Sequence, residues 1–539
     1  MGAFRLEQLH FQYDAPDGEG APRAVFEELE LVLETGWRTA LVGRNGRGKT
    51  TLLRLLHGEL EPTRGSLQRP GPTTRFPFDL GDTERPLREA VREGVAPFGA
   101  WEARMETLLE AGDEASLTEY AELLERYEAA GGYEIEARVE RELAGLGFDP
   151  EQTSRPLASL SAGERTRALV AVLFLRPGHF PLIDEPTNHL DMAGRELLGE
   201  YLRGKPGFLL ASHDRHFLDL CCDHVLALER AEVRLERGSF SSWLERRDQR
   251  EEAERRRNEE LAREVASLEA DARRRRVWSG RKEKEKRGAF DKGRVGKLAA
   301  RTMKRAMSAE RRRDQSVEEK RSLLRNVEKE RELRLRKEGG GPELVVELDH
   351  ADVAHPGRPA GGPPLLRDVC LRVERGDRLA VVGPNGSGKS SLLAALAGER
   401  ELLAGRRHLP PRLRVARAYQ LPLWAEGRLA DHLHAASIDE GIFRATMGQL
   451  GIRGAVFDRP LETFSLGERK KVDLCRSFLE PQHLFLWDEP MNDIDLASRE
   501  DIEEVLLREE PTMVFVEHDR AFVEAVATEV LDLAALAGS

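Results

Sequence analysis

The chain contains 539 residues, of which 40% are hydrophobic and 33% are charged, and its formal net charge is −12. This length predicts about three or four domains with ordinary buried cores, and the negative charge argues against generalised affinity for nucleic acid. No stretch approaches the ~18 consecutive apolar residues of a membrane helix, and the N-terminal sequence lacks a signal-peptide pattern, so we expect a cytoplasmic protein without a channel of its own.

The first chemical motif follows an apolar strand expected at residues 39–42. Residues 43–50 read GRNGRGKT, which matches the phosphate-binding pattern G-x-x-x-x-G-K-[ST] between a strand and a helix. Its glycines let backbone N–H groups wrap phosphates, the lysine reaches the β and γ phosphates, and the next hydroxyl offers a ligand to Mg²⁺. The pattern predicts that ATP is bound by Gly43, Asn45, Gly46, Gly48, Lys49, Thr50 and Thr51, with Thr50 also a metal ligand.

Two further features lie within the first 240 residues. Residues 87–145 are rich in Leu, Glu, Ala and Arg at helical spacing, which predicts an inserted helical hairpin. Asp184 and Glu185 end the apolar run FPLI. A carboxylate at a strand end can hold Mg²⁺, and the carboxylate after it can polarise the attacking water.

The segment at residues 241–340 differs from both of its neighbours. It holds 33 Lys and Arg against 21 Asp and Glu, so it is a basic arm on an otherwise acidic chain. Its start carries the 4-3-4 apolar spacing of one coiled-coil seam. Glycines interrupt the helical pattern further along and predict a tip at about 273–313, where 18 residues are basic and 4 are acidic. We expect two linker helices that carry this tip away from the body.

The remaining residues repeat the motifs of the first part. The phosphate loop recurs 340 residues later as GPNGSGKS, whereas the serine motif and the acidic pair recur after 304 residues, which locates an insertion in the first copy. Histidines follow the acidic pair in both copies, and this equivalence favours a γ-phosphate sensor. The repeat assigns ATP binding to Gly383, Asn385, Gly386, Gly388, Lys389, Ser390 and Ser391. The predicted Mg²⁺ ligands are Asp184, Ser390 and Asp488. The predicted catalytic residues are Glu185, Glu489, His213 and His518.

With these motifs in place, the sequence resembles the ABC ATPases. LSAGE at residues 160–164 and FSLGE at 464–468 are similar to the ABC signature, whose serine and backbone amides contact the γ-phosphate bound by the opposite cassette. The resemblance implies an α/β fold of two P-loop ABC-type nucleotide-binding domains, residues 1–240 and 341–539, joined by the long α-helical, coiled-coil-like linker. It also implies two ATP molecules sandwiched head to tail in a monomeric chain, with signature contacts from Ser161, Gly163, Ser465 and Gly467.

Two cassettes, a charged helical linker and no membrane domain look like the ABC-F group of translation factors. GRNGRGKTTLL, the FPF run at 76–78, WDEPMNDID and DKGRVGKLAARTMKR are most similar to its ribosome-protecting antibiotic-resistance members. This implies binding at the ribosomal exit site, with the linker reaching along the P-site tRNA towards the peptidyl-transferase centre to dislodge a drug. Basic side chains neutralise phosphates and tryptophan stacks on bases, so the expected contacts with large-subunit rRNA or tRNA are Arg276, Trp278, Lys292, Arg294, Lys297, Lys304 and Arg305.

Two positions are less regular. Gln420 stands where the family's Q-loop glutamine belongs and is expected to complete a Mg²⁺ shell, whereas residues 70–150 of the first copy contain no glutamine. Asp79 is a candidate substitute. Tyr13 is either an adenine-stacking residue or an ordinary strand residue.

Three other functions remain open on the sequence. One is a housekeeping translation factor with the same two-state clamp, and the others are the ATPase motor of a membrane transporter and a DNA-associated coiled-coil ATPase. An export motor has no evident need for a 100-residue basic arm. A DNA-associated ATPase would normally carry a longer arm that ends in a dimerising hinge.

Overall fold

The computed structural model describes residues 2–13, 23–229, 233–253, 256–257, 260, 263, 333–336, 341–354 and 363–537. The chain divides into two compact units, residues 1–241 with 332–539 and residues 242–331. The tip predicted at 273–313, with its seven candidate RNA contacts, lies outside the described residues. Among the described residues, no helix is both long and apolar enough to cross a membrane.

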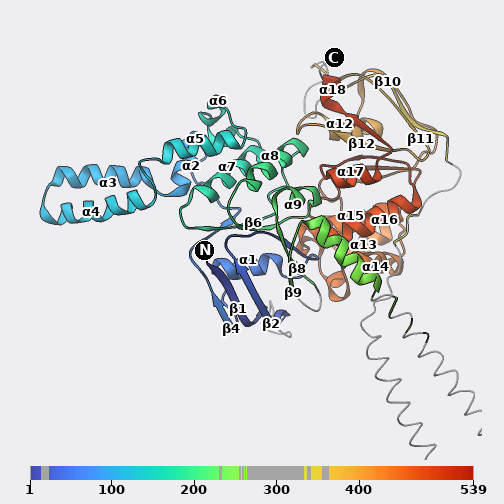
Figure 1. The fold of residues 1–539 in the computed structure, drawn as a ribbon. Helices are drawn as coiled ribbons and strands as arrows, with labels where there is room; N and C mark the ends of the chain where they lie inside the picture. Colours follow the sequence, from blue (N-terminus) through green and yellow to red (C-terminus); the bar gives the residue numbers. More distant parts are fainter. Residues whose placement is uncertain are drawn as a thin grey trace, which may run out of the picture. The chain divides into compact units, whose positions relative to one another are not determined.

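The first cassette, residues 2–241, contains two sheets, drawn in blue to green in Figure 1. One has the order β5-β6-β7-β3-β8-β9 and is parallel except for its last pair, and the other is antiparallel with the order β2-β1-β4. The parallel strands are apolar runs because both of their faces are buried. Their bounds are β1 (Ala3–Tyr13), β2 (Arg23–Glu34), β3 (Arg38–Val42), β4 (Arg64–Gln68), β5 (Thr73–Phe76), β6 (Phe180–Asp184), β7 (Phe208–Ala211), β8 (His224–Leu228) and β9 (Val233–Arg237).

The helices of the first cassette connect these strands. Their bounds are α1 (Lys49–His57), α2 (Leu87–Val95), α3 (Phe98–Ala111), α4 (Glu114–Ala129), α5 (Ile135–Gly145), α6 (Pro150–Thr153), α7 (Ala162–Leu175), α8 (Met192–Arg203) and α9 (Arg215–Cys221). Helices α3 and α4 lie side by side as a hairpin (Figure 1). The hairpin is joined by an ion pair between Arg104 and Glu119 at 2.7 Å and by edge-to-face packing of Phe98 on Tyr127.

The second cassette, residues 333–537, repeats this plan with a parallel sheet of order β14-β15-β16-β12-β17 and an antiparallel sheet of order β11-β10-β13. Its strands are β10 (Leu344–Val353), β11 (Leu366–Glu374), β12 (Arg378–Val382), β13 (Leu402–His408), β14 (Val415–Ala418), β15 (Leu484–Asp488), β16 (Met513–Val516) and β17 (Glu529–Asp532). Its helices are α12 (Lys389–Leu396), α13 (Leu429–Ala435), α14 (Glu440–Gln449), α15 (Leu466–Leu479), α16 (Leu496–Glu509), α17 (Arg520–Val526) and α18 (Leu533–Ala537).

The strand order positions the candidate site. In each cassette the strand before the phosphate loop lies at the centre of the sheet, with β3 between β7 and β8 and β12 between β16 and β17. The strand that ends in the acidic pair lies next but one, as β6 and β15. In open parallel sheets, ligands bind beyond the carboxyl ends of the strands. The topology therefore brings the phosphate loop, acidic pair and histidine of each cassette to one sheet edge.

Candidate functional site

Each phosphate loop closes on the first turn of a helix. Gly48 and Gly388, at φ 96° and 101°, cap helices α1 and α12 in the left-handed conformation. A Cβ on Gly48 would lie 2.6 Å from Val25 Cγ1, so this position requires glycine sterically as well as conformationally. Lys49 Nζ donates to the Gly43 carbonyl at 2.7 Å, and Lys389 Nζ makes the same bond to its own loop at 2.9 Å.

The candidate metal ligands are hard oxygen donors beside these loops. Thr50 Oγ1 donates to Asp184 Oδ2 at 3.2 Å. In the second cassette, Asp488 Oδ1 is buried without a hydrogen-bond partner among the described residues. Burial raises the pKa of both aspartates, while the hydroxyls of Thr50 and Ser390 oppose this. A hydroxyl, a carboxylate and phosphate oxygens form the donor set that Mg²⁺ prefers, so these residues fit that ion.

The two candidate catalytic glutamates share an unusual backbone. Glu185 and Glu489 have φ values of 51° and 48°, in the left-handed region. Non-glycine residues held there cost on the order of 1–3 kcal/mol and cluster at functional sites. The Glu185 N–H donates to the Ala211 carbonyl at 2.8 Å, and the Glu489 N–H donates to the Val516 carbonyl at 3.0 Å. In each cassette, the adjacent strand thus fixes the backbone of the glutamate at the corresponding edge of its own sheet.

Each glutamate meets the histidine that the sequence paired with it. His213 Nε2 lies 3.2 Å from Glu185 Oε1, and His518 Nε2 donates to Glu489 Oε1 at 3.2 Å. Both imidazoles are buried. Burial holds the pKa of His213 well below its usual range, with Lys49 adding to the effect. The His213 ring is therefore neutral at physiological pH.

The two glutamates differ in their other partners. Glu489 Oε2 accepts hydrogen bonds from Asn492 Nδ2 at 2.8 Å and from Gln420 Nε2 at 3.3 Å. Asn188, the counterpart of Asn492, instead donates to Asp493 Oδ1 of the second cassette at 3.1 Å. Among the described residues, Glu185 Oε1 accepts no hydrogen bond, because the His213 contact at 3.2 Å does not have hydrogen-bond geometry.

The two glutamates also differ in acidity. Burial raises the pKa of Glu185 to about 8, and Asp184 adds to the rise against the opposing charge of Lys49. Burial also acts on Glu489, but the His518 hydrogen bond and two lysine charges outweigh it and lower the pKa of Glu489. Glu185 is thus the weaker acid of the pair.

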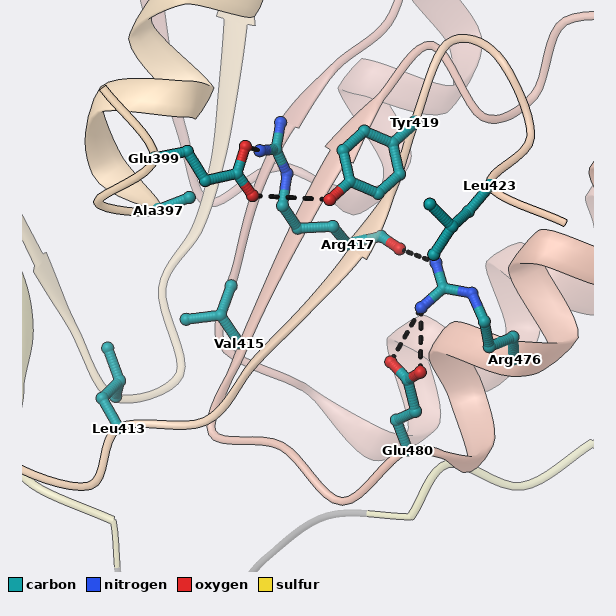
Figure 2. A pocket seen from close by; sticks show the side chains of 9 residues that line it. All are labelled: Ala397, Glu399, Leu413, Val415, Arg417, Tyr419, Leu423, Arg476 and Glu480. Carbon is teal, nitrogen blue, oxygen red and sulfur yellow. Dashed lines mark hydrogen bonds and ion pairs between the residues drawn. The ribbon is translucent and has the colours of Figure 1, made fainter. Parts of the chain in front are cut away.

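Gln420 is held by the strand that precedes it. That strand, β14, borders a pocket of about 330 Å³ lined by two linked arginines (Figure 2). Arg476 pairs with Glu480 at 2.9 Å and donates to the Arg417 carbonyl, and the Arg417 side chain pairs with Glu399. This network ties β14 to α15 and to the segment after α12.

The first cassette has no equivalent of that glutamine. Counted from the end of β5, Phe78 holds the place, and Arg176 stacks on its ring at 5.2 Å. The carboxylate of Asp79 accepts from the Gly81 N–H at 3.0 Å, inside its own loop. No described contact joins Asp79 to Glu185, so the structure gives no support for its role as a substitute.

The signature serines begin helices. Ser161 and Ser465 are the N-caps of α7 and α15, and each accepts from the backbone N–H three residues later at 3.2 Å. The glutamates at these positions, Glu164 and Glu468, complete capping boxes. A helix N-terminus favours an anion, because its free N–H groups and its dipole both point outward. These serines therefore lie where a phosphate is favoured.

Each phosphate loop meets the other cassette near a signature. Asn45 Nδ2 donates to the Asp493 carbonyl at 3.0 Å, and a Cβ on Gly467 would lie 2.7 Å from that same oxygen. On the other side, Asn385 Nδ2 donates to the His189 carbonyl at 3.2 Å, and a Cβ on Gly163 would lie 2.9 Å from it.

We name the two composite sites by their phosphate loops. Site 1 joins residues 43–50 to the signature at Ser465, and site 2 joins residues 383–390 to the signature at Ser161. Tyr13 lies at the end of β1 beside site 1, where its hydroxyl is 3.1 Å from Thr51 Oγ1 and its ring meets Phe11 edge-on.

Comparison with known proteins decides the family. The ABC transporter family model matches residues 26–188 and 366–492. The tylosin resistance ATP-binding protein TlrC of Streptomyces fradiae is 33% identical over 535 residues, which is 92% of each chain. The chain belongs to the ABC-F family of ABC ATPases.

Other relatives of this ABC-F ATPase include the energy-dependent translational throttle protein EttA of Mycobacterium tuberculosis, 27% identical over 94% of this chain and 88% of that protein. The ATP-binding protein Uup of Escherichia coli is 29% identical over 94% of this chain and 77% of that protein. A solved complex of the archaeal ribosome recycling factor aABCE1 with the stalk protein aP1 matches at 19% identity and a TM-score of 0.53, covering 94% and 84% of the two chains. That match supports the twin-cassette fold alone.

Family membership establishes ATP as the substrate and hydrolysis as the reaction of this ABC-F ATPase. The structure brings together the predicted loop, acidic pair and histidine of each cassette. Sequence reasoning missed Asn188, Asn492 and Asp493, which give the two glutamates different hydrogen-bond surroundings. A signal was present, because Asn188 and Asn492 recur at the same 304-residue spacing as the acidic pairs.

Proposed function

We propose that this ATPase binds the ribosomal exit site and uses its linker, near the P-site tRNA and the peptidyl-transferase centre, to dislodge antibiotics. The observation that carries the proposal is the likeness to TlrC over nearly the full length of both chains. The basic arm supports it, since 18 basic residues against 4 acidic at residues 273–313 suit a surface of RNA phosphates. The cytoplasm is the compartment in which such a protein would act.

The two sites supply the switch. In each, lysine and loop amides bind the ATP phosphates, the glutamate holds the attacking water, and the histidine contacts the γ-phosphate. Mg²⁺, held by Thr50 with Asp184 and by Ser390 with Asp488 and Gln420, would neutralise phosphate charge. The signature of the opposite cassette completes the phosphate shell, so ATP favours closed cassettes. ATP moves the arm only through its different affinity for open and closed states.

Sedimentation with ribosomes tests the partner. Glu185→Gln with Glu489→Gln keeps the shape of both side chains but removes both bases, so ATP should trap the closed form on ribosomes. The matched control, Lys49→Ala with Lys389→Ala, removes the phosphate-binding ammonium groups and should not co-sediment in ATP. We expect ATP-dependent binding that survives high salt. Equal, salt-labile binding in ATP and ADP would contradict the proposal and reduce the arm to a non-specific polycation.

A second measurement separates protection from a housekeeping role, which the likeness to EttA favours. Ribosomes loaded with labelled tylosin are mixed with the protein and ATP, and release of the drug is followed. Faster release than from untreated ribosomes supports protection. Unchanged release, together with ATP-dependent ribosome binding, would leave the housekeeping translation factor as the function.

A further inference from the structure

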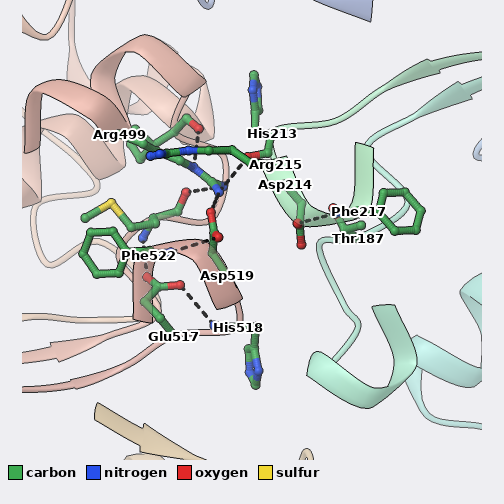
Figure 3. Close-up of polar contacts among 12 residues, drawn as sticks. Thr187, His213, Asp214, Arg215, Phe217, Arg499, Glu517, His518, Asp519 and Phe522 are labelled. Atoms are coloured by element: carbon green, nitrogen blue, oxygen red, sulfur yellow. Dashed lines mark hydrogen bonds and ion pairs between the residues drawn. The ribbon is translucent and has the colours of Figure 1, made fainter. Parts of the chain in front are cut away.

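One buried arginine lies between the histidine turns of both cassettes. Arg499, in the first turn of α16, donates through Nη1 to the His213 carbonyl of the first cassette at 2.8 Å. The same nitrogen donates to Asp519 Oδ2 of its own cassette at 2.9 Å. Asp519 follows His518 directly and caps α17 by accepting from the Phe522 N–H. Figure 3 shows the guanidinium between these two turns.

The remaining nitrogens of Arg499 fix its orientation. Nε donates to the Ile494 carbonyl at 3.0 Å, and Nη2 donates to the Met491 carbonyl at 2.8 Å. The side chain is 6% exposed and the Asp519 side chain 1% exposed. A fully bonded, buried guanidinium is rigid, because its planar fork fixes the direction of every donor. A shift of either histidine turn would therefore disturb the contact with the other.

The counterpart of this arginine shows what the cross-cassette bond adds. Arg195, 304 residues earlier, makes the same two bonds within its own cassette, from Nε to the Leu190 carbonyl at 3.1 Å and from Nη1 to Asp214 Oδ2 at 2.8 Å. Among the described residues, the hydrogen bonds and the ion pair of Arg195 stay inside the first cassette. Two bonds of Arg499 have no counterpart among those described for Arg195, from Nη2 to the Met491 carbonyl of its own cassette and from Nη1 to the opposite histidine turn. Only the second crosses to the other cassette.

A second contact occurs on the same side of the interface. Arg215, two residues after His213, pairs with Glu503 of α16 at 2.6 Å. The equivalent arginine, Arg520, pairs with Glu524 on its own helix instead. The position equivalent to Glu503 is Gly199, where a Cβ would lie 2.5 Å from Leu220 Cδ2. Glycine carries no carboxylate, so a second pair of this kind is not formed at that position.

We propose that Arg499 is a positioning residue shared by both ATP sites: it holds the His213 turn of site 1 and the His518 turn of site 2, so hydrolysis at the two sites is coupled through it. Arg195 serves the His213 turn alone. The inference rests on the proposed roles of Glu185 and Glu489 and adds a link between them.

Single-site variants of the full chain test the link. Glu489→Gln leaves site 1 active, Glu185→Gln leaves site 2 active, and Arg499→Lys or Arg195→Lys is added to each. Lysine keeps a charge beside the buried aspartate, but one nitrogen cannot reach the acceptors that the guanidinium spans. We expect Arg499→Lys to lower kcat at both sites by about tenfold with KM for ATP changed less than about twofold, and Arg195→Lys to lower kcat at site 1 alone.

The outcomes are distinct. Unchanged site 1 turnover in Arg499→Lys would overturn the proposal, and so would a loss at both sites in Arg195→Lys, because the effect would then be general. Turnover that persists in the double Glu185→Gln, Glu489→Gln variant would instead refute the glutamate roles. Should Arg499→Lys not fold, Glu503→Gln replaces it, with Glu524→Gln as control: loss of kcat at site 1 in Glu503→Gln alone supports the link, and equal turnover overturns it.

Discussion

The unequal acidities of Glu185 and Glu489 predict different pH profiles for the two sites. A general base must be ionised to accept a proton from water. With a pKa of about 8, about one Glu185 side chain in ten is ionised at pH 7 and about half at pH 8. Glu489 has a lowered pKa, so it is fully ionised throughout this range. The kcat/KM of site 1 should therefore rise about fivefold between pH 7 and pH 8, while that of site 2 stays level.

Phosphate release by the single-site variants measures this directly. Glu489→Gln reports site 1 and Glu185→Gln reports site 2, and kcat/KM is compared from pH 6.5 to pH 9. The terminal phosphate of ATP also titrates near pH ~6, but the ratio of the two sites cancels its effect. The ratio should rise with pH and level off above the pKa of Glu185. A ratio that is independent of pH would refute the assigned difference between the two carboxyl environments.

Four further results are expected. Asn492→Ala removes a hydrogen-bond donor from Glu489, so the pKa of Glu489 should rise. The kcat/KM of site 2, measured in the Glu185→Gln background, should then depend on pH, whereas Asn188→Ala should leave it level. Lys471→Met leaves the charge of the buried Asp495 unpaired and should lower the free energy of unfolding by roughly 3–5 kcal/mol in urea. Adding Asp495→Asn removes that charge but keeps an acceptor for the Ser498 N–H, so it should recover part of the loss, and no recovery would contradict the pairing argument. Gly467→Ala should lower site 1 turnover about tenfold, since its Cβ would lie 2.7 Å from the Asp493 carbonyl, and normal turnover would show that the interface yields. Chelation of Mg²⁺ should abolish hydrolysis, and Thr50→Val should raise the Mg²⁺ concentration needed at site 1 but not at site 2.

The duplicated motifs predicted the cassettes and the contents of each site. Two phosphate loops between strand and helix predict a parallel sheet with its ligand beyond the strand ends. The motif is readable from the sequence because its residues are contiguous in the chain. The pairing of Glu185 with His213 and of Glu489 with His518 followed from their recurrence in both copies. The structure places each pair at 3.2 Å.

The unequal partners of the glutamates could not be read from the sequence. Asn188 and Asn492 are the same residue type at equivalent positions, yet one donates to the glutamate of its own cassette and the other crosses to Asp493. The partner of each asparagine depends on which acceptor the tertiary structure places beside its amide. Local propensity carries no information about it, because the partners are 305 residues apart for Asn188 and three for Asn492.

Several differences between the two cassettes bear on the same interface. In site 1, Glu185 has no counterpart of the Asn492 and Gln420 bonds that Glu489 accepts. Asn188, the counterpart of Asn492, donates to Asp493 of the second cassette instead. The Arg215–Glu503 pair and the Arg499 bond to the His213 carbonyl also cross beside site 1. The asparagine that bonds to the glutamate in the second cassette therefore has a counterpart in the first that bonds between the cassettes. We expect site 1 to contribute more to holding the cassettes together and site 2 to be the better hydrolytic site at pH 7.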